Sequence, residues 1–173
     1  INGVQVGPTD SDGVSLASAD TTTANLDYRS AIAKANAINE VSSETGVTAT
    51  VGAAVLNGTT AIGAVTLAAG TLLEINGVLV IDGGDTGLGG GATTTAGDGN
   101  NLIRNLINAQ SSETGVTATI DAATSQLILT AEDGRNITVE ATAVAAQVAG
   151  IGFTQADGTS EASVNHHASG TIT

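Results

Sequence analysis

The string SSETGVTAT stands at Ser42–Thr50 and again, unchanged, at Ser111–Thr119. The two copies are 111 − 42 = 69 positions apart. The same offset places Ile38-Asn39 over Ile107-Asn108, so the similarity extends upstream of the string itself. A short identical string with matched surroundings indicates a structural unit that occurs twice in the chain.

A helix is predicted ahead of each copy, because apolar residues recur there at helical spacing. In the first copy the residues at this spacing, which define the expected buried face, are Tyr28, Ile32, Ala35 and Ile38. In the second copy two i, i+4 pairs share one face, and they consist of Leu102, Ile103, Leu106 and Ile107.

The repeated string is expected to end each helix and begin a strand. Gly46 and Gly115 stand where a helix often ends in a left-handed residue, a conformation that glycine adopts without a Cβ penalty. After each glycine, Val47–Val51 and Val116–Ile120 alternate apolar and polar residues with period two, as half-buried strands do.

Further strands are predicted around these exits. Ile-Asn-Gly-Val occurs at Ile1–Val4 and at Ile75–Val78, and we expect a strand-like element ahead of each helix. The second copy continues with alternating strands and turns, in the order Asp121–Ser125 (turn), Gln126–Thr130 (strand), Glu132–Arg135 (turn) and Asn136–Ala141 (strand). In the first copy, Gly63–Leu73 is expected to hold the matching strands and to lead into a hairpin at Asn76-Gly77.

The predicted fold class is therefore α+β. It consists of two related small αβ units, each with one helix packed on an antiparallel β meander, and β-rich connecting and C-terminal segments. We expect a first unit over residues 1–74 and a second over 75–141, with a flexible glycine-rich loop or linker at 83–99. Residues 142–173 are expected to hold a short helix at Ala143–Ala149, stopped by Gly150, and a polar hairpin or edge strand over Gly158–Thr173.

Composition excludes several classes of function. The chain carries 17 acidic and 4 basic residues, a formal net charge of −13, which disfavours nucleic acid and anionic membranes as partners. The absence of cysteine excludes disulfides and thiolate chemistry. With one Phe, one Tyr and no Trp or Met, the core is expected to consist of Val, Ile, Leu and Ala. The apolar stretch Ala61–Ile81 is interrupted by Gly70, Glu74 and Asn76-Gly77, which favours a hairpin over a membrane helix.

Three short motifs contain residue types that can bind metal ions. His166-His167 is the only histidine pair, but adjacent strand residues point to opposite faces and cannot easily share one metal. Asp10-Ser-Asp-Gly13 and Asp82-Gly-Gly-Asp85 resemble the start of a calcium loop, but both lack the closing acidic ligand. Turn chemistry explains the acidic motifs, so no metal and no cofactor is predicted.

Other motifs also favour a non-catalytic reading. Gly83–Gly91 lacks the Lys-Ser/Thr ending of a phosphate loop. Arg135 is expected to pair with Asp133 on the surface. Asn57-Gly-Thr59 and Asn136-Ile-Thr138 match the N-glycosylation pattern, which matters only in a compartment that holds the transferase. No Ser-His-Asp set, carboxylate pair or nucleophile elbow stands out, so the chain is predicted not to be an enzyme.

The repeated segments resemble the repeat motif of bacterial flagellins and hook-associated proteins. The resemblance rests on four stretches and on the two ING elements, and the stretches are Ala31–Thr50, Leu106–Thr119, Leu127–Ile137 and Gly170–Thr173. It covers most of residues 1–141 and, more loosely, the tail. It implies a structural protein, the variable, solvent-exposed outer domain of a flagellin.

The resemblance also implies partners and a location. The long heptad-rich terminal helices through which flagellins polymerise are absent here, so we expect an outer domain that is monomeric by itself. In the whole protein, those helices would contact other flagellin subunits. The expected location is the extracellular flagellum, reached by type III export without a cleaved signal peptide.

The sequence leaves two alternatives open. The first is the equivalent domain of a hook-associated or filament-cap protein, since those proteins share the repeat. The second is an extracellular adhesion or carbohydrate-binding module. Sugar binding usually uses aromatic platforms, and only Tyr28 and Phe153 could supply one.

Overall fold

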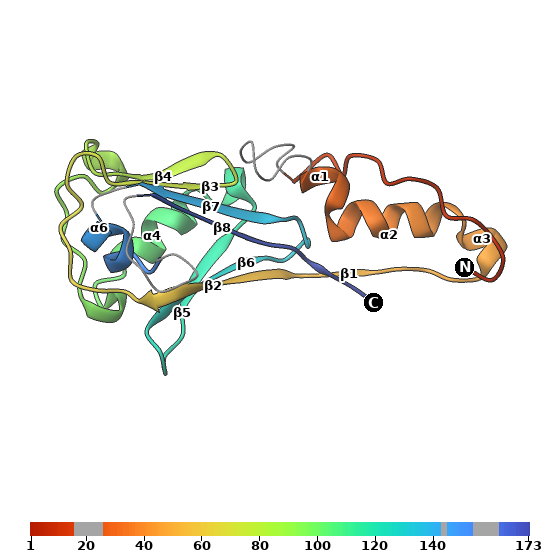
Figure 1. Ribbon diagram of the computed structural model, residues 1–173. Coiled ribbons are helices and arrows are strands. Elements are labelled where there is room, and N and C mark those ends of the chain that lie inside the picture. Colours follow the sequence, from red (N-terminus) through yellow and green to blue (C-terminus); the bar gives the residue numbers. More distant parts are fainter. Residues whose placement is uncertain (16–25, 143–144, 154–162) are drawn as a thin grey trace.

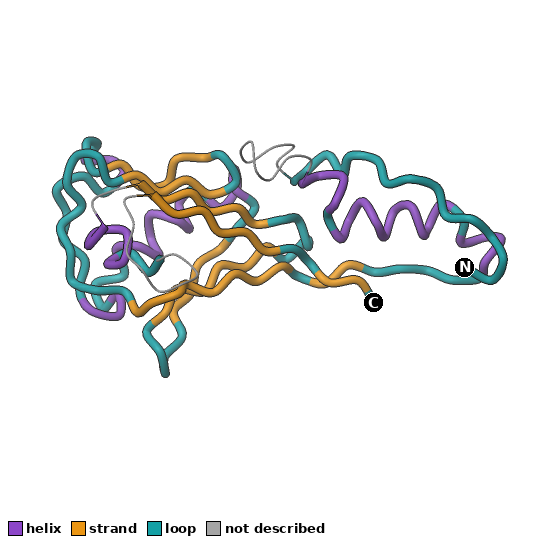
Figure 2. Tube along the Cα trace, in the orientation of Figure 1, coloured by secondary structure: helices purple, strands orange, loops and turns teal. Residues whose placement is uncertain are grey.

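The structure is a computed structural model that describes residues 1–15, 26–142, 145–153 and 163–173. The molecule is elongated (Figure 1). One end is an arm that holds three consecutive helices, α1 (Leu26–Arg29), α2 (Ala31–Glu40) and α3 (Ser42–Thr45). The other end is a body of antiparallel strands with the remaining helices, as the colouring by secondary structure also shows (Figure 2).

Two antiparallel sheets form the body. The three-stranded sheet has the order β2-β6-β5, from β2 (Ala54–Ala61), β6 (Gln126–Ala131) and β5 (Thr117–Ile120). The four-stranded sheet has the order β4-β3-β7-β8, from β4 (Val78–Asp82), β3 (Leu72–Ile75), β7 (Ile137–Thr142) and β8 (Ser163–Ala168). A short two-stranded ladder in the arm joins β1 (Val51–Gly52) to β9 (Thr171–Ile172).

Helix α4 (Leu102–Ala109) is the central helix of the body and contacts β4 of one sheet and β5 of the other. The predicted face is confirmed, because Ile103 and Ile107 are fully buried and Leu102 and Leu106 pack against the same core. The core consists of Val, Ile, Leu and Ala side chains together with Phe153. The mixture of helices and antiparallel sheets confirms the α+β fold class.

The strands and turns predicted for the second copy are confirmed. Short α5 (Ser111–Thr114) ends at Gly115, and β5 follows and pairs with β6. The predicted meander is wrong, because β7 lies in the other sheet between β3 and β8. The Asn76-Gly77 hairpin joins β3 to β4, with φ of 51° and 75° at its two turn residues. Strand β2 of the first copy pairs with β6 of the second. Strands from the two predicted units thus share one sheet. The unit boundaries at residues 75 and 142 remain predictions from the sequence.

The buried face predicted for the first helix is confirmed at Ala35 and wrong at its three larger residues. Tyr28 is 44% exposed, and Ile32 and Ile38 are only half-buried. The residues that α2 buries are its alanines, Ala31, Ala33, Ala35 and Ala37. At helical spacing these fall on two opposite sides. Extended segments run along α2 on both sides, so small side chains are needed on each (Figure 1).

The strand predicted over Val47–Val51 is wrong for most of its length. Regular pairing begins only at β1, where Val51 lies opposite Ile172 and Gly52 opposite Thr171. Gly63–Leu73 is also not the expected strand pair, since β3 begins at Leu72 and the loop before it forms an isolated bridge from Thr66 to Thr93 and no regular strand. Alternation of apolar and polar residues produces a regular strand only where another strand lies alongside.

Ile1–Val4 forms a turn, so the strand-like element predicted there is wrong. Asn2 and Gly3 have φ of 52° and 84°, and the Val4 N–H donates to the Ile1 carbonyl at 2.9 Å. The pair Asn2-Gly3 thus adopts the conformation of the Asn76-Gly77 hairpin turn. The Ile-Asn-Gly-Val repeat specifies a turn in both places.

The glycine-rich segment 83–99 is a loop, as one of the two predicted possibilities had it, and it is packed against the rest of the body. It contains two short 3₁₀ helices, η1 (Thr86–Leu88) and η2 (Ala96–Asp98). Gly83 lies so close to the Ala68 carbonyl that any Cβ at this position would collide with it. Thr94 is buried and donates its hydroxyl to the Gly63 carbonyl at 2.7 Å.

The C-terminal segment agrees with its prediction where it is described. Helix α6 (Ala145–Gly150) ends at the expected glycine, and β8 is the edge strand beside β7. The predicted residues 143–144 and 158–162 lie outside the described residues. None of the described helices combines the length and the apolar character that crossing a bilayer would require.

Candidate functional site

The exit from α5 is fixed by local hydrogen bonds around Gly115. Gly115 has φ of 71°, in the left-handed region, and its N–H donates to the Ser111 carbonyl at 2.9 Å. The Thr114 hydroxyl donates to the Gln110 carbonyl at 3.1 Å and accepts from the Val116 N–H at 3.1 Å. Together they satisfy backbone groups that the helix end would leave unpaired.

Two asparagines tie this exit to its surroundings. Asn108 on α4 bonds both backbone groups of Ala118, accepting from its N–H at 2.7 Å and donating to its carbonyl at 3.1 Å. Asn76 in the hairpin turn donates its side-chain amide to the Thr114 carbonyl at 2.8 Å. The side chain of Asn108 thus occupies the place of a neighbouring strand on one edge of β5.

The first copy repeats this bonding. Asn39 accepts from the Ala49 N–H at 2.7 Å and donates to the Ala49 carbonyl at 2.9 Å. Asn2 donates to the Thr45 carbonyl at 2.9 Å. Gly46 has φ of 68°, and its N–H donates to the Ser42 carbonyl at 2.8 Å. Both glycines stand at the predicted helix exits, so the duplicated string has a duplicated local structure.

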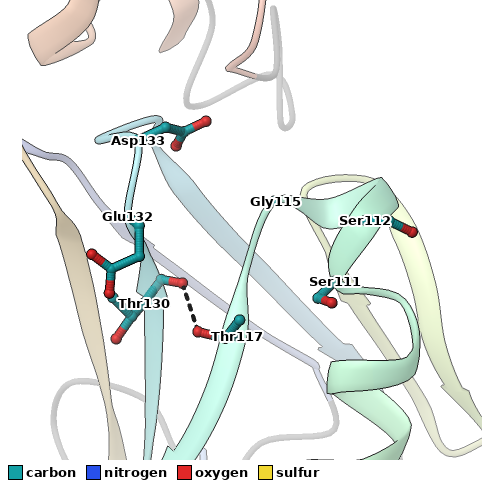
Figure 3. A pocket seen from close by; sticks show the side chains of 7 residues that line it. All are labelled: Ser111, Ser112, Gly115, Thr117, Thr130, Glu132 and Asp133. Atoms are coloured by element: carbon teal, nitrogen blue, oxygen red, sulfur yellow. Dashed lines mark hydrogen bonds between the residues drawn. The ribbon is translucent and has the colours of Figure 1, made fainter.

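A shallow pocket of about 360 Å³ lies beside the second copy (Figure 3). The Thr117 hydroxyl lies in it and donates to the Thr130 carbonyl at 3.4 Å, between β5 and β6. The residues that line the pocket are small, hydroxyl-bearing or acidic, namely Ser111, Ser112, Gly115, Thr117, Thr130, Glu132 and Asp133.

Arg135 contacts two of the residues that line this pocket, Gly115 and Asp133. Its guanidinium lies against Gly115, where a Cβ would collide with it. It also donates to the Asp133 carboxylate, at 2.8 Å from Nε and 2.7 Å from a terminal nitrogen. Partial burial acts to raise the pKa of Asp133, but the hydrogen bonds and charge of Arg135 outweigh it and hold that pKa below its ordinary value. The predicted Arg135–Asp133 pair is confirmed.

The pocket offers little chemistry. Its hydroxyl groups have no histidine, lysine or cysteine among the lining residues to activate them. Its two acidic residues, Glu132 and Asp133, follow each other in one turn, and Asp133 is already paired with Arg135. The residues that line the pocket lie where the end of α5 meets the β5–β6 hairpin and the turn that follows it.

The acidic turns weighed as calcium loops use their carboxylates locally. Asp12 accepts from the backbone N–H groups of Val14 and Ser15 at 3.0 and 2.8 Å. Partial burial acts to raise the pKa of Asp12, but hydrogen bonds from Ser15, Ser30 and the backbone lower it below its ordinary value. In the other turn, Asp82 accepts from Gly84 N–H and Asp85 from Gly87 N–H, both at 2.7 Å. These carboxylates stabilise turns.

The other weighed residues do not come together at one site. His166 and His167 lie in β8, opposite Val139 and Thr138 of β7. Among the described residues, no group of three or more His, Cys, Asp or Glu side chains could hold a metal ion.

The glycosylation patterns and the aromatic residues also lie apart. Asn57 in β2 is exposed, whereas Asn136 of the second pattern is 1% exposed. Phe153 is fully buried and cannot stack on a sugar, while Tyr28 is exposed on α1. The structure therefore brings no aromatic platform together from these two residues.

Sequence reasoning missed the role of the asparagines. Asn39 and Asn108 occupy the same place relative to the two copies, as do Asn2 and Asn76 within their Ile-Asn-Gly-Val elements. This repetition was the available signal. An asparagine amide has both a donor and an acceptor, so it can satisfy the N–H and the carbonyl of one strand residue.

Comparison with known families gives one match. Residues 79–133 match the family model described as the flagellin hook IN motif. The matched range runs from β4 through the glycine-rich loop, α4, α5, β5 and β6 to the turn at Asp133. The match supports a flagellin-type structural protein of the bacterial flagellum, and a non-enzymatic role. Comparison with curated proteins gives no match.

Proposed function

We propose that this chain is a solvent-exposed outer domain of a flagellar filament subunit. The observation that carries the proposal is the flagellin hook IN match, which covers α4, α5, β5 and β6. The first copy of SSETGVTAT has the same bonds at Gly46 and Asn39 as the second copy has at Gly115 and Asn108, which supports the further proposal that the first unit is another repeat of this kind.

The surface suits this role. A filament repeats each surface many times, so a net charge far from zero limits association between neighbouring filaments. The formal charge of −13 provides such repulsion. On this proposal, assembly with other flagellin subunits is made by parts of the protein outside this chain. The domain reaches the cell exterior through the flagellar export route.

Labelling of intact bacteria tests the proposal. The chain has no cysteine, so an introduced cysteine reports one position of this domain. Ala122 lies exposed in the turn between β5 and β6, whereas Ala131 is fully buried at the end of β6. We expect Ala122→Cys filaments to bind a maleimide dye along their whole length and Ala131→Cys filaments to bind little.

Two other outcomes are informative. Labelling of Ala122→Cys only where the hook meets the filament would replace this proposal by the hook-associated alternative. Labelling that requires cell lysis would contradict an exterior flagellar role altogether. The Ala131→Cys control separates surface exposure from unfolding, because an unfolded domain would expose both positions.

A further inference from the structure

The equivalence of the two copies stops at one edge of the first unit. In the second unit, Asn76 also exchanges bonds with β7: its N–H donates to the Thr138 carbonyl at 3.0 Å, and its side-chain oxygen accepts from the Thr138 N–H at 2.8 Å. Asn2, its counterpart, has only the bond to Thr45 within the described part of the chain. The turn at Asn2 in the first unit could therefore bond to a strand equivalent to β7. None of the described strands lies beside this turn.

The strand register shows which strand of the first unit has the position that β6 has in the second unit. In the second unit, Ile120 of β5 lies opposite Leu127 of β6. The residue equivalent to Ile120 in the first unit is Val51, 69 positions earlier, and it lies opposite Ile172 of β9. Thr50 and Thr173 continue this register with reciprocal backbone bonds of 2.8 and 3.0 Å. Strand β9 therefore occupies the place of β6. Its direction carries the chain from Thr173 toward Ala49 and Thr48, the counterparts of Ala118 and Thr117.

Apolar side chains are left open on the same edge. Ile1, Val47 and Ile172 are 42%, 36% and 38% exposed. Their counterparts in the second unit are Ile75, Val116 and Leu127, and all three are fully buried. In the second unit β7 lies directly beside Ile75, through the register pair Ile75–Val139.

An open groove of about 380 Å³ lies at this edge. Its lining comes from the N-terminal segment, α2 and β9, and includes Ile1, Val6, Ala37, Ile38 and Ile172. Ile38 is the counterpart of the fully buried Ile107. The groove therefore lies where the second unit has its core.

We propose that this groove is the docking site for a β-hairpin joined to Thr173, with the sequence pattern of Leu129–Thr142. Its first strand continues β9 alongside residues 47–49, and its second strand exchanges bonds with Asn2 as β7 does with Asn76. A turn with an Asp-Gly-Arg sequence would place its arginine over Gly46, whose Cβ position is open, as Arg135 lies over Gly115. The body of the molecule is then an insertion within a first repeat that this hairpin completes. This inference does not depend on the flagellar assignment.

A graft tests the inference directly. The graft adds a copy of residues 129–142, with the sequence LTAEDGRNITVEAT, directly after Thr173. Thr173 has the register position of Ile128, so the added leucine follows it as Leu129 follows Ile128. The matched control inserts one serine before the same fourteen residues, which moves every side chain to the opposite face. We expect the in-register graft to slow amide hydrogen exchange at Asn2 and Thr48 by at least about ten-fold, because strand pairing protects these groups. The shifted graft is expected to leave both amides close to their rates in the unmodified chain.

A second variant tests docking without relying on exchange alone. Val47→Asn is expected to shift the melting temperature of the unmodified chain by about 1 °C or less, since Val47 is partly exposed there. In the grafted chain the same change is expected to lower the melting temperature by roughly 4 °C or more, because Val47 would be buried. Equal behaviour of the two grafts, or equal effects of Val47→Asn with and without the graft, would overturn the proposal. A dimer of the unmodified chain in sedimentation that already protects Thr48 would also overturn it, in favour of a second copy as occupant.

Discussion

The helix exits at Gly46 and Gly115 have the same sequence and the same local hydrogen bonds but very different surroundings. Both glycines are left-handed, with φ of 68° and 71°, and each exit is bonded to an asparagine of the preceding helix. Val47 beyond the first exit is 36% exposed, whereas Val116 beyond the second is fully buried. Nine identical residues thus determine how the chain turns, and the segments packed against them determine what is buried.

This difference indicates that the second exit contributes more to the free energy of unfolding than the first. In the second unit the exit faces β6, β7 and the shared core, so its apolar side chains are removed from water. In the first unit the exit faces the short β9 and an open groove. Equivalent substitutions in the two units should therefore change the free energy of unfolding by different amounts. The size of the difference measures how much the strands that cover the second exit contribute to stability.

The largest difference is expected for the isoleucine pair on the two helices. Ile107→Ala should destabilise the protein by about 2–5 kcal/mol, because it removes a fully buried side chain and leaves a cavity. Ile38→Ala should have a clearly smaller effect, because Ile38 is half-buried beside the groove. Urea unfolding of the two variants measures both losses. Equal losses would show that the first unit is as well packed as the second.

The asparagine pair sharpens the comparison at the level of hydrogen bonds. Asn108→Ala leaves the N–H and carbonyl of Ala118 without their partner, and we expect a loss of about 1–3 kcal/mol. Asn39→Ala removes the same two bonds from Ala49, but the neighbouring Thr48 and Thr50 are exposed and water can reach the edge more easily. A smaller loss is expected there in the same unfolding measurement. A larger loss for Asn39→Ala would reverse the ranking of the two units.

The glycine pair separates backbone strain from packing. Gly46→Ala should destabilise by about 1 kcal/mol, since a left-handed residue acquires a Cβ but nothing lies near it. Gly115→Ala should destabilise by about 1–2 kcal/mol or more, because the Arg135 guanidinium must also move. In an Arg135→Ala background the two costs should become similar. Thermal unfolding of the four variants checks this, and a difference that persists without Arg135 would point to another cause.

The smallest effect is expected from the Asp133–Arg135 pair, which has no described counterpart at the first exit. The pKa of Asp133 is lowered in the folded protein, so its contribution is present above the unfolded pKa and is lost as pH falls through the folded pKa. The Asp133 side chain is 44% exposed, which limits the pair to about 0–1 kcal/mol. We expect Asp133→Asn to lower stability slightly at pH 6 and to match the unmodified chain near pH 2. An undiminished gap at low pH would contradict this origin.

The strands and turns of the second unit could be predicted from sequence because their patterns are local, although β6 and β7 also pair with the distant strands β2 and β3. Gln126–Thr130 and Asn136–Ala141 alternate strongly and are separated by recognisable turns, and both are strands. The hairpin at Asn76-Gly77 was equally clear. The glycine positions at 46 and 115 were correctly placed because a helix exit of this type depends on local conformation alone.

The first unit was predicted poorly because its burial depends on distant segments. Val47–Val51 has the same alternation as Val116–Ile120, but only β9 lies opposite it. Tyr28 fits the helical spacing, but the two sides of α2 are covered through alanines. Glycines in the 83–99 segment predicted a flexible loop or linker, and the close contact of Gly83 with Ala68 could not be predicted from the sequence. The asparagine bonds were missed because a side chain that replaces a strand leaves no periodic pattern.

Amide hydrogen exchange at Thr48 and Thr117 tests the central claim most directly. The two residues hold the same place in the repeated string. The N–H of Ala118 is bonded to Asn108, so alternation along β5 directs the Thr117 N–H toward β6. We predict slow exchange at Thr117 and fast exchange at Thr48, with Ala49 and Ala118 both protected by their asparagines. Similar protection of Thr48 and Thr117 would contradict the account, since it would mean that both exits are already closed by a strand.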